Sequence, residues 1–191
     1  MNASSPRRHF VDAFTVIELL IVMSVIIVLA GLVLGTSGYV QKKGQRSRAE
    51  AEIAALSAAL ESYKADNGIY PREASSDALD PRLSGDPNAY QAASLFLFKE
   101  LSGLDENGAP VAGAKSYFAF KPQMLSGLRS TGGNVSTITG IRDPFGNHYG
   151  YSTANQVDSA KGYNPTFDLW STGGTEGRAS PPSQSQWIKN W

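Results

Sequence analysis

The N-terminal part of the chain carries an apolar run, residues 13–35, that contains a single carboxylate, Glu18. At about 1.5 Å per residue, a helix from Phe14 to Gly35 is about 33 Å long, which is enough to cross a hydrocarbon layer of about 30 Å with Glu18 inside it. A charge in that layer costs at least about 2.5–3.5 kcal/mol, so Glu18 is a candidate functional residue. The alternative is that Glu18 reaches the headgroups from near the helix end.

The residues around Glu18 form a motif. Residues 13–20 read AFTVIELL, and a short basic leader, residues 1–12, precedes them. This stretch resembles the class III signal of prepilins and pseudopilins, in which a small residue, usually Gly, precedes Phe-Thr-(Leu/Val)-Ile-Glu-Leu-Leu. The resemblance implies that a prepilin peptidase cuts after Ala13 on the cytoplasmic side of a membrane, and that the new amine of Phe14 is then methylated.

An ordinary secretory signal peptide is the competing interpretation of this N-terminus. The apolar run is longer than the roughly 7–15 residues typical of such signals, and no A-x-A cleavage site follows it. Basic residues lie on both sides of the run, so charge alone does not orient it. The orientation with the leader in the cytoplasm is implied by the resemblance.

Composition excludes several classes of function. With 17 basic and 17 acidic residues, the chain has no bulk attraction to nucleic acid. It has no Cys and no GxSxG, HExxH or Walker A motif, so we expect no enzymatic activity. The two histidines, His9 and His148, are expected to be structural or exposed.

A basic cluster follows the apolar run and consists of Lys42, Lys43, Arg46 and Arg48. Contact with DNA is one interpretation of such a cluster. We favour attraction to membrane headgroups, or pairing with acids of neighbouring subunits.

Helical periodicity continues beyond the apolar run. Apolar residues recur at spacings of four and three and form one stripe: Ala49, Ile53, Leu56, Leu60 and Tyr63. Gly68, directly after Asn67, and Pro71 then end the helix. We therefore predict one helix from about Thr15 to Asn67, with a transmembrane and filament-core half over residues 14–38 and an amphipathic half over residues 39–67.

Residues 68–191 predict a small C-terminal α+β domain. A helix is expected at 89–101, and short strands at 116–120, 148–152 and 167–171, whereas residues 69–88 are expected to be irregular. The aromatic side chains of Tyr149, Tyr151 and Trp191 are expected in its core. The predicted fold class is α+β, in which the long N-terminal helix packs on a small antiparallel β-sheet.

Three C-terminal motifs narrow the resemblance. Residues 143–151, DPFGNHYGY, look like the Asp-Pro-Trp-Gly-x-x-Tyr-x-Tyr turn of type II secretion major pseudopilins. Residues 167–173, FDLWSTG, are similar to their Asp-(Ile/Leu)-x-Ser-x-Gly strand end, and residues 187–191, WIKNW, to their closing Asp-Ile-x-Asn-Trp. The chain is thereby identified as similar to the G-type major pseudopilins, which implies a pilin-like fold. Residues 72–142 match no part of the pattern.

The family resemblance implies a calcium site, but the residues of this chain do not favour one. Major pseudopilins bind calcium in the loop before the C-terminus, and calcium takes six to eight oxygen ligands, several of them carboxylates. Here that loop offers only Glu176, with Asp168 nearby in sequence. We therefore expect no metal or other cofactor, with Asp168 and Glu176 as weak calcium candidates. Asp168 is expected to face solvent or to cap the strand end.

The resemblance implies a structural subunit that polymerises into a periplasmic pseudopilus driving protein export in a type II secretion-like apparatus. In this interpretation Glu18 of one protomer pairs with the Phe14 amine of its neighbour, which neutralises both charges and fixes the stagger between subunits. The implied partners are further copies of the chain, minor pseudopilins, the prepilin peptidase, an inner-membrane assembly platform with its ATPase, and membrane lipid. The implied location is the inner membrane, crossed once, with the globular domain in the periplasm.

Two other functions fit the sequence less well. A type IV pilin for adhesion, motility or DNA uptake is disfavoured because many such pilins close their C-terminal region with a Cys pair, and this chain has no Cys. A monomeric, membrane-anchored periplasmic domain is the alternative from a different class. Crosslinked ladders that depend on Glu18 distinguish any filament subunit from that monomer.

Overall fold

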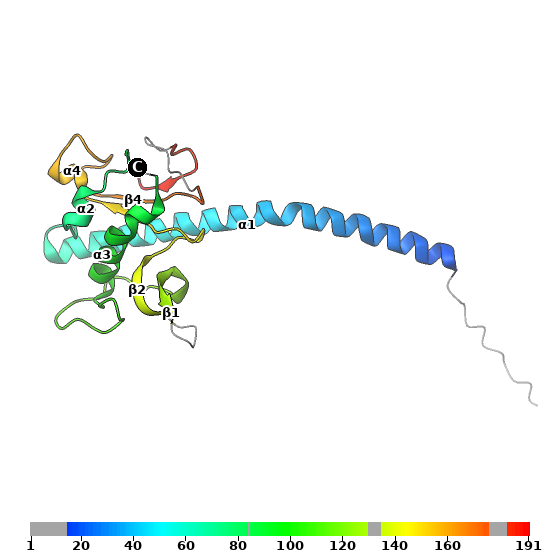
Figure 1. Cartoon of the computed structure of the whole chain (residues 1–191), viewed down its shortest axis with the longest axis horizontal. Helices are drawn as coiled ribbons and strands as arrows, with labels where there is room; N and C mark the ends of the chain where they lie inside the picture. The colour runs from blue at the N-terminus through cyan, green and yellow to red at the C-terminus, as the bar shows by residue number, and fades with distance from the viewer. Residues whose placement is uncertain (1–14, 84, 130–134, 176–182) are drawn as a thin grey trace, which may run out of the picture. The chain divides into compact units, whose positions relative to one another are not determined.

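The computed structural model describes residues 15–83, 85–129, 135–175 and 183–191, and at 33–37, 128–129 and 135–136 it describes the backbone alone. The chain divides into two compact units, Met1–Lys42 and Lys43–Trp191. The long helix α1, Val16–Asn67, belongs partly to each unit (Figure 1). The predicted helix from Thr15 to Asn67 is thus confirmed to within one residue at its start.

Between Leu19 and Leu32, in the first unit, α1 is apolar around its whole circumference. Its one polar side chain between Leu19 and Leu32 is Ser24, whose hydroxyl donates to the carbonyl of Ile21 at 2.7 Å. No helix in the part of the chain that the structure describes has the length and apolarity needed to cross a membrane. The transmembrane half predicted over residues 14–38 includes residue 14, which lies outside the described residues, and it stays a prediction.

In the second unit, one face of α1 forms part of the main core. The predicted stripe is confirmed, because Ala49, Ile53, Leu56 and Leu60 are buried and Tyr63 packs partly buried against them. The helix ends as the sequence indicates, with Gly68 at a φ of 79° and its N–H donating to the carbonyl of Lys64 at 2.8 Å. A left-handed residue of this kind satisfies one of the carbonyls left over at a helix end.

The remaining elements are short. The helices are α2 (Ala74–Ala78), η1 (Pro87–Tyr90), α3 (Gln91–Ser102), η2 (Pro122–Met124) and α4 (Ala154–Val157). The strands are β1 (Leu125–Arg129), β2 (Val135–Ile141), β3 (Gly150–Ser152), β4 (Asp168–Ser171) and β5 (Ile188–Lys189). They form two antiparallel sheets, a β1–β2 pair and a three-stranded sheet in the order β3-β4-β5.

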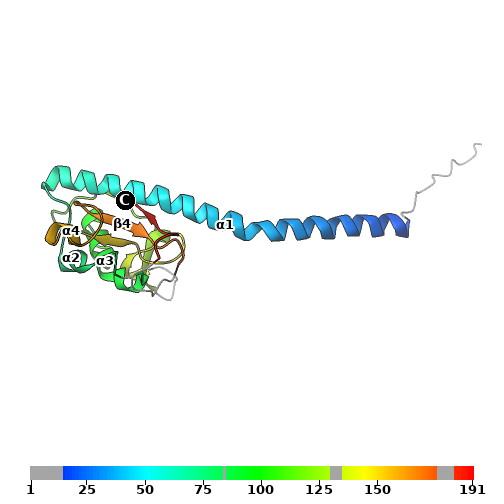
Figure 2. The same cartoon turned by 90° about the horizontal axis from the view of Figure 1, so that it is seen from above.

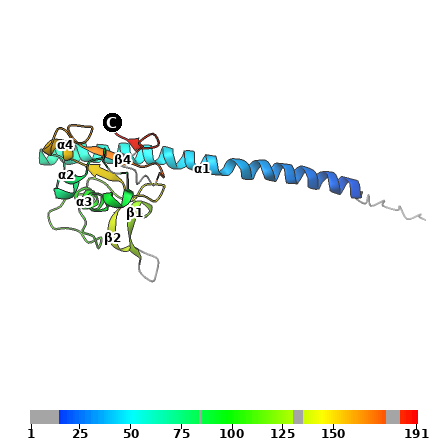
Figure 3. The same ribbon diagram turned by 45° about the horizontal axis from the view of Figure 1, so that its top comes forward.

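Within the second unit, the elements form layers. In Figure 2, β4 lies between the C-terminal part of α1 on one side and α2 and α3 on the other. The β1–β2 pair lies on a different side of α3 from β4, as Figure 3 shows. The residues of the main core come from α1, α3 and both sheets, so α3 packs between the two sheets and α1 covers them.

The expected elements are mostly confirmed. The helix predicted at 89–101 is α3, and the strands predicted at 148–152 and 167–171 correspond to β3 and β4. The strand predicted at 116–120 is wrong, because the N–H groups of Tyr117 and Phe118 both donate to the carbonyl of Leu101 instead of to a strand. Strands β1, β2 and β5 and the short helix α4 were not predicted from the sequence. The prediction that residues 69–88 are irregular is wrong at α2 and at the start of η1.

Several aromatic side chains occupy the predicted core positions. Tyr149 and Tyr151 are fully buried, as expected. Trp191 is partly buried and packs against a second, smaller cluster of Tyr90, Trp170 and Trp187. The indole rings of Trp170 and Trp187 stack with their centroids 5.9 Å apart.

Trp170 occupies the space above Gly150, and this contact gives a test of the fold. A Cβ at Gly150 would overlap the indole ring of Trp170, so Gly150→Ala should lower the free energy of unfolding by about 1–3 kcal/mol or more, as overpacking does. Gly44→Ala is the matched control, because no atom lies within 4 Å of a Cβ at that helical position and alanine there should raise stability by about 0.5–1 kcal/mol. Denaturant unfolding of both variants measures the difference, and equal stabilities would contradict the predicted packing.

Candidate functional site

Glu18 lies in the first turn of α1 and is held there by Thr15. The Glu18 carboxylate accepts the backbone N–H and the hydroxyl of Thr15, both at 2.8 Å to Oε2, while the Glu18 N–H donates to the Thr15 hydroxyl at 3.3 Å. This reciprocal arrangement is a capping box, and it satisfies N–H groups that have no partner within the helix. The Thr-x-x-Glu spacing is visible in the sequence, but the sequence analysis did not use it.

Glu18 therefore has a local structural role that does not require a second molecule. Its side chain is nevertheless exposed, and both hydrogen bonds that it accepts from Thr15 are to Oε2. The other predicted residues of this site, Ala13 and Phe14, lie outside the described residues, as does His9. The predicted cleavage, methylation and amine pairing thus stay predictions.

The segment of α1 around and after Glu18 has an exposed apolar surface. Large apolar side chains on all sides of α1 are between 51% and 81% exposed: Val16, Ile17, Leu19, Leu20, Ile21, Val22, Met23, Val25, Ile26, Ile27, Val28, Leu29 and Leu32. A helix that is apolar all round is normally buried, and contiguous apolar surface of this kind marks an interaction site.

The basic cluster lies on α1 after its apolar segment, and it is partly neutralised within the chain. Arg46 pairs with Glu50 at 3.4 Å and donates to the backbone carbonyl of Gln186 at 3.0 Å. Arg48 pairs with Glu52 at 2.7 Å. Two of the four cations predicted to contact headgroups or neighbouring subunits therefore have acidic partners one helical turn away.

The turn at residues 143–147 is built around a buried carboxylate, Asp143. Its Oδ1 accepts the backbone N–H groups of Phe145 and Asn147, each at 2.9 Å, and its Oδ2 accepts the hydroxyl of Ser171 on β4. Burial raises the pKa of Asp143, and these hydrogen bonds oppose that rise. The carboxylate thus joins two of the family-like motifs, the turn and the strand end, in one buried contact.

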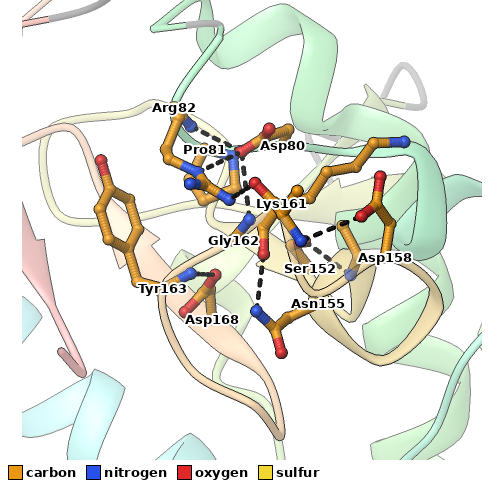
Figure 4. A network of polar contacts seen from close by, with 12 residues as sticks. Asp80, Pro81, Arg82, Ser152, Asn155, Asp158, Lys161, Gly162, Tyr163 and Asp168 are labelled. Atoms are coloured by element: carbon orange, nitrogen blue, oxygen red, sulfur yellow. Dashed lines mark hydrogen bonds and ion pairs between the residues drawn. The ribbon is translucent and has the colours of Figure 1, made fainter.

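Asp168, at the start of β4, is buried, so the expectation that it faces solvent is wrong. Its two oxygens accept the backbone N–H groups of Tyr163 and Asn164 at 2.8 and 2.9 Å, which shapes the loop before the strand (Figure 4). Burial raises its pKa, partly opposed by those two bonds. The N–H groups that this carboxylate accepts belong to the loop that precedes β4.

A second buried carboxylate, Asp80, lies beside the same loop. Its Oδ1 accepts the N–H groups of Arg82 and Gly162, and the Arg82 guanidinium lies 3.5 Å from it (Figure 4). The guanidinium also donates to the carbonyl of Ala160. An arginine therefore supplies positive charge beside these acids.

Of the two calcium candidates, the structure describes only Asp168. Glu176 lies outside the described residues, and in the part of the chain that the structure covers no group of three or more His, Asp or Glu side chains is arranged to hold a metal ion. The oxygens of Asp168 bind backbone N–H groups. The expectation that no calcium binds stays a prediction from the sequence.

Asn190 is a structural residue that the sequence analysis did not single out. Its side-chain oxygen accepts the N–H of Leu169 at 2.9 Å, and its amide donates to the carbonyl of Phe167 at 3.2 Å. Its backbone N–H also donates to the carbonyl of Leu169. The side chain thereby continues the β4–β5 ladder beyond the last strand residue, which gives the Asn of the closing motif a physical role.

One comparison with known proteins agrees with the sequence motifs. The chain is 35% identical over 83 residues to the type II secretion system core protein G of Aeromonas hydrophila. The chain thus resembles a type II secretion pseudopilin. The match covers 42% of this chain and 58% of that protein, so the chain spans little more than half of the relative's length. No family model matches the chain.

The buried Asp143 predicts a specific pH dependence of stability. Its pKa is raised above the ordinary value of 3.8, so at pH values between the unfolded and folded pKa the native state holds a proton that the unfolded state has lost. The contribution of this group to the free energy of unfolding is therefore largest at low pH and is lost as the pH rises through the folded pKa. Asp143→Asn should weaken this decline, as measured by denaturant unfolding across the acid range.

Asp66 provides a control of opposite sign. Hydrogen bonds from Lys115 and Tyr117 lower the pKa of this exposed carboxyl, so its contribution is present at higher pH and is lost as the pH falls through the folded pKa. Asp66→Asn should therefore make the decline with rising pH steeper. Identical pH profiles for wild type, Asp143→Asn and Asp66→Asn would contradict both assignments.

Proposed function

We propose that the chain is a structural, non-catalytic pseudopilin of a type II secretion-like apparatus, which polymerises into a filament that drives protein export. The observation that carries the proposal is the exposed apolar helix Val16–Leu32, placed directly after a class III-like signal. The similarity to a type II secretion core protein supports the same function.

The apolar helix supports self-association. Lateral packing of several copies covers apolar side chains on every side of each helix, which no single neighbour does. Each large apolar side chain that becomes fully buried contributes about 1.5–3 kcal/mol. A bundle of these helices is therefore the proposed filament core.

We propose that the charge of Glu18 stabilises this bundle by pairing with a neighbouring copy of the chain. Removal of residues 1–13 would create an amine at Phe14, and pairing of this amine with the Glu18 carboxylate of a neighbour would neutralise both groups in apolar surroundings. The capping box leaves this possible, because the carboxylate is exposed and Thr15 is bonded to one of its oxygens. Thr15 would then orient the carboxylate as well as cap the helix.

The further partners belong to the same proposal. They are minor pseudopilins, a prepilin peptidase, and an inner-membrane assembly platform with its ATPase, together with membrane lipid. The proposed location is the cell envelope at the inner membrane, with the second unit in the periplasm. No nucleic-acid partner is proposed, because the charges of the chain balance and two cations of the basic cluster are paired internally.

Substitutions at Glu18 distinguish charge pairing from helix capping. Glutamine can replace glutamate in a capping box but carries no charge. If pairing is required, Glu18→Gln and Glu18→Ala should both be cleaved normally and both fail to form filaments, with yields in a sheared-filament assay lowered at least about tenfold. If capping alone matters, Glu18→Gln should assemble like wild type and only Glu18→Ala should fail.

Glu50→Gln is the matched control for this experiment. Glu50 lies on the same helix and its ion pair with Arg46 is exposed, so its loss should change stability by less than about 1 kcal/mol and leave filament yield unchanged. Normal filament yield from Glu18→Ala would refute the pairing mechanism.

The position of the N-terminus is a separate test. The mature protein, isolated from the cell envelope and analysed by mass spectrometry of its N-terminal peptide, should begin at a methylated Phe14. A mature chain that begins at any other residue would refute the class III assignment, whatever the filament assay shows.

A further inference from the structure

The second unit contains a hollow of about 390 Å³ that the proposed function does not use. Its walls come from three segments: the end of α1 supplies Tyr63 and Asn67, α3 supplies Lys99 and Glu100, and the loop of residues 104–117 closes the remaining side. Pockets of about 300–1,000 Å³ hold small organic ligands. The hollow is therefore at the small end of that range.

The loop wall is fixed to α3 by its backbone. The N–H groups of Tyr117 and Phe118 donate to the carbonyl of Leu101 at 2.8 and 2.9 Å, and the N–H of Val111 donates to that of Gly103 at 2.9 Å. Gly103 ends α3 at a φ of 71°, and a Cβ there would lie 3.3 Å from the backbone of Lys115. The wall is thus held in place without a ligand, which reduces the entropy cost of binding.

The lining carries two cations, Lys99 and Lys115, and two acids, Glu100 and Asp105. The ammonium group of Lys99 pairs with Glu106, and that of Lys115 pairs with Asp66. The Glu100 carboxylate accepts the hydroxyl of Tyr63 at 2.7 Å. Because both lysines pair with acids outside the lining, acids outnumber cations around the hollow, which disfavours an inorganic anion. Among the described residues, no group of three or more His, Asp or Glu side chains is arranged to hold a metal ion.

These groups keep hydrogen-bonding capacity that they do not use internally. An ammonium group has three donors and a carboxylate can accept about four hydrogen bonds. Each lysine pairs with one carboxylate, and Glu100 accepts one hydrogen bond from Tyr63. The hollow therefore presents donors and acceptors side by side, as a ligand with several hydroxyl groups requires.

Two aromatic rings line the same space. Tyr63 and Tyr117 lie with their centroids 5.2 Å apart at an interplanar angle of 56°, and the Asn67 amide donates to the Tyr117 hydroxyl at 3.0 Å. Both rings are half-buried. The negative face of an aromatic ring attracts the weakly positive C–H groups of a sugar ring.

We propose that this hollow is a binding site for a neutral saccharide. The lack of net positive charge, the adjacent donors and acceptors, and the aromatic wall together match a polyhydroxylated, uncharged ligand. The site uses neither Glu18 nor the apolar helix, so it does not depend on the proposed filament function.

Saturation-transfer NMR with the purified full-length chain tests this site. Maltotriose and chitotriose serve as neutral probes whose signals are observed directly. Glucuronic acid, inorganic phosphate, calcium ions and a zwitterionic tripeptide serve as comparators in competition against the bound saccharide, because phosphate and calcium ions have no carbon-bound protons to observe. At least one neutral saccharide should bind at millimolar concentration or below, and at least about tenfold more tightly than any comparator.

Two substitutions locate the binding. Tyr117→Ala removes one aromatic wall and should weaken saccharide binding about tenfold. Ala114→Trp adds bulk at an exposed residue of the lining without touching the ion pairs, and it should abolish binding even if Tyr117→Ala fails to fold. Ala109→Trp, at an exposed residue of the same loop outside the lining, is the matched control and should bind like wild type.

Several results would overturn the proposal. One is that no neutral saccharide binds, and another is that phosphate, calcium, glucuronic acid or the tripeptide binds as tightly as the saccharides do. Unchanged binding by a folded Ala114→Trp variant would show that the saccharide is held elsewhere.

Discussion

The second unit depends on the burial of one face of α1. Ala49, Leu56 and Leu60 are fully buried there, and each of the two leucines contributes about 1.5–3 kcal/mol through the removal of its side chain from water. The two sheets are small, with two and three strands, and sheets of this size need a packed layer to be stable. Because α3 and both sheets meet on this face of α1, its loss would leave them without a common core.

Tyrosines attach this core to its polar surroundings. The hydroxyl of Tyr149 donates to Glu52 on α1 at 2.8 Å, Tyr70 donates to Glu61 at 2.8 Å, and Tyr151 donates to a backbone carbonyl at 2.6 Å. Burial raises the pKa of each of these hydroxyls, so they remain protonated donors. A tyrosine thus places its ring among apolar side chains and its hydroxyl on a fixed acceptor. The bond from Tyr149, directly before β3, to Glu52 joins α1 to the start of that strand.

The apolar side chains of α1 are exposed in the first unit, whereas in the second unit its apolar stripe is buried. After Lys43, α1 buries its apolar stripe within its own chain, whereas between Val16 and Leu32 the apolar side chains remain exposed on all sides. Glu18 and Thr15 form the capping box at the start of this segment. The proposed filament follows from that contrast, because packing between molecules would bury the apolar side chains of the first unit. Packing within the chain buries those of the second unit.

The sequence by itself determined the long helix, its buried stripe and its end at Gly68, because these depend on local spacing and on one left-handed glycine. The motifs at 143–151, 167–173 and 187–191 also indicated the family resemblance, although their roles as a buried carboxylate turn and a side-chain extension of a ladder needed the structure. Only the tertiary structure decided that residues 116–120 attach to the end of α3 instead of forming a strand, and that Asp168 is buried. Both outcomes depend on partners distant in sequence, such as the carbonyl of Leu101, which no local pattern of residues specifies.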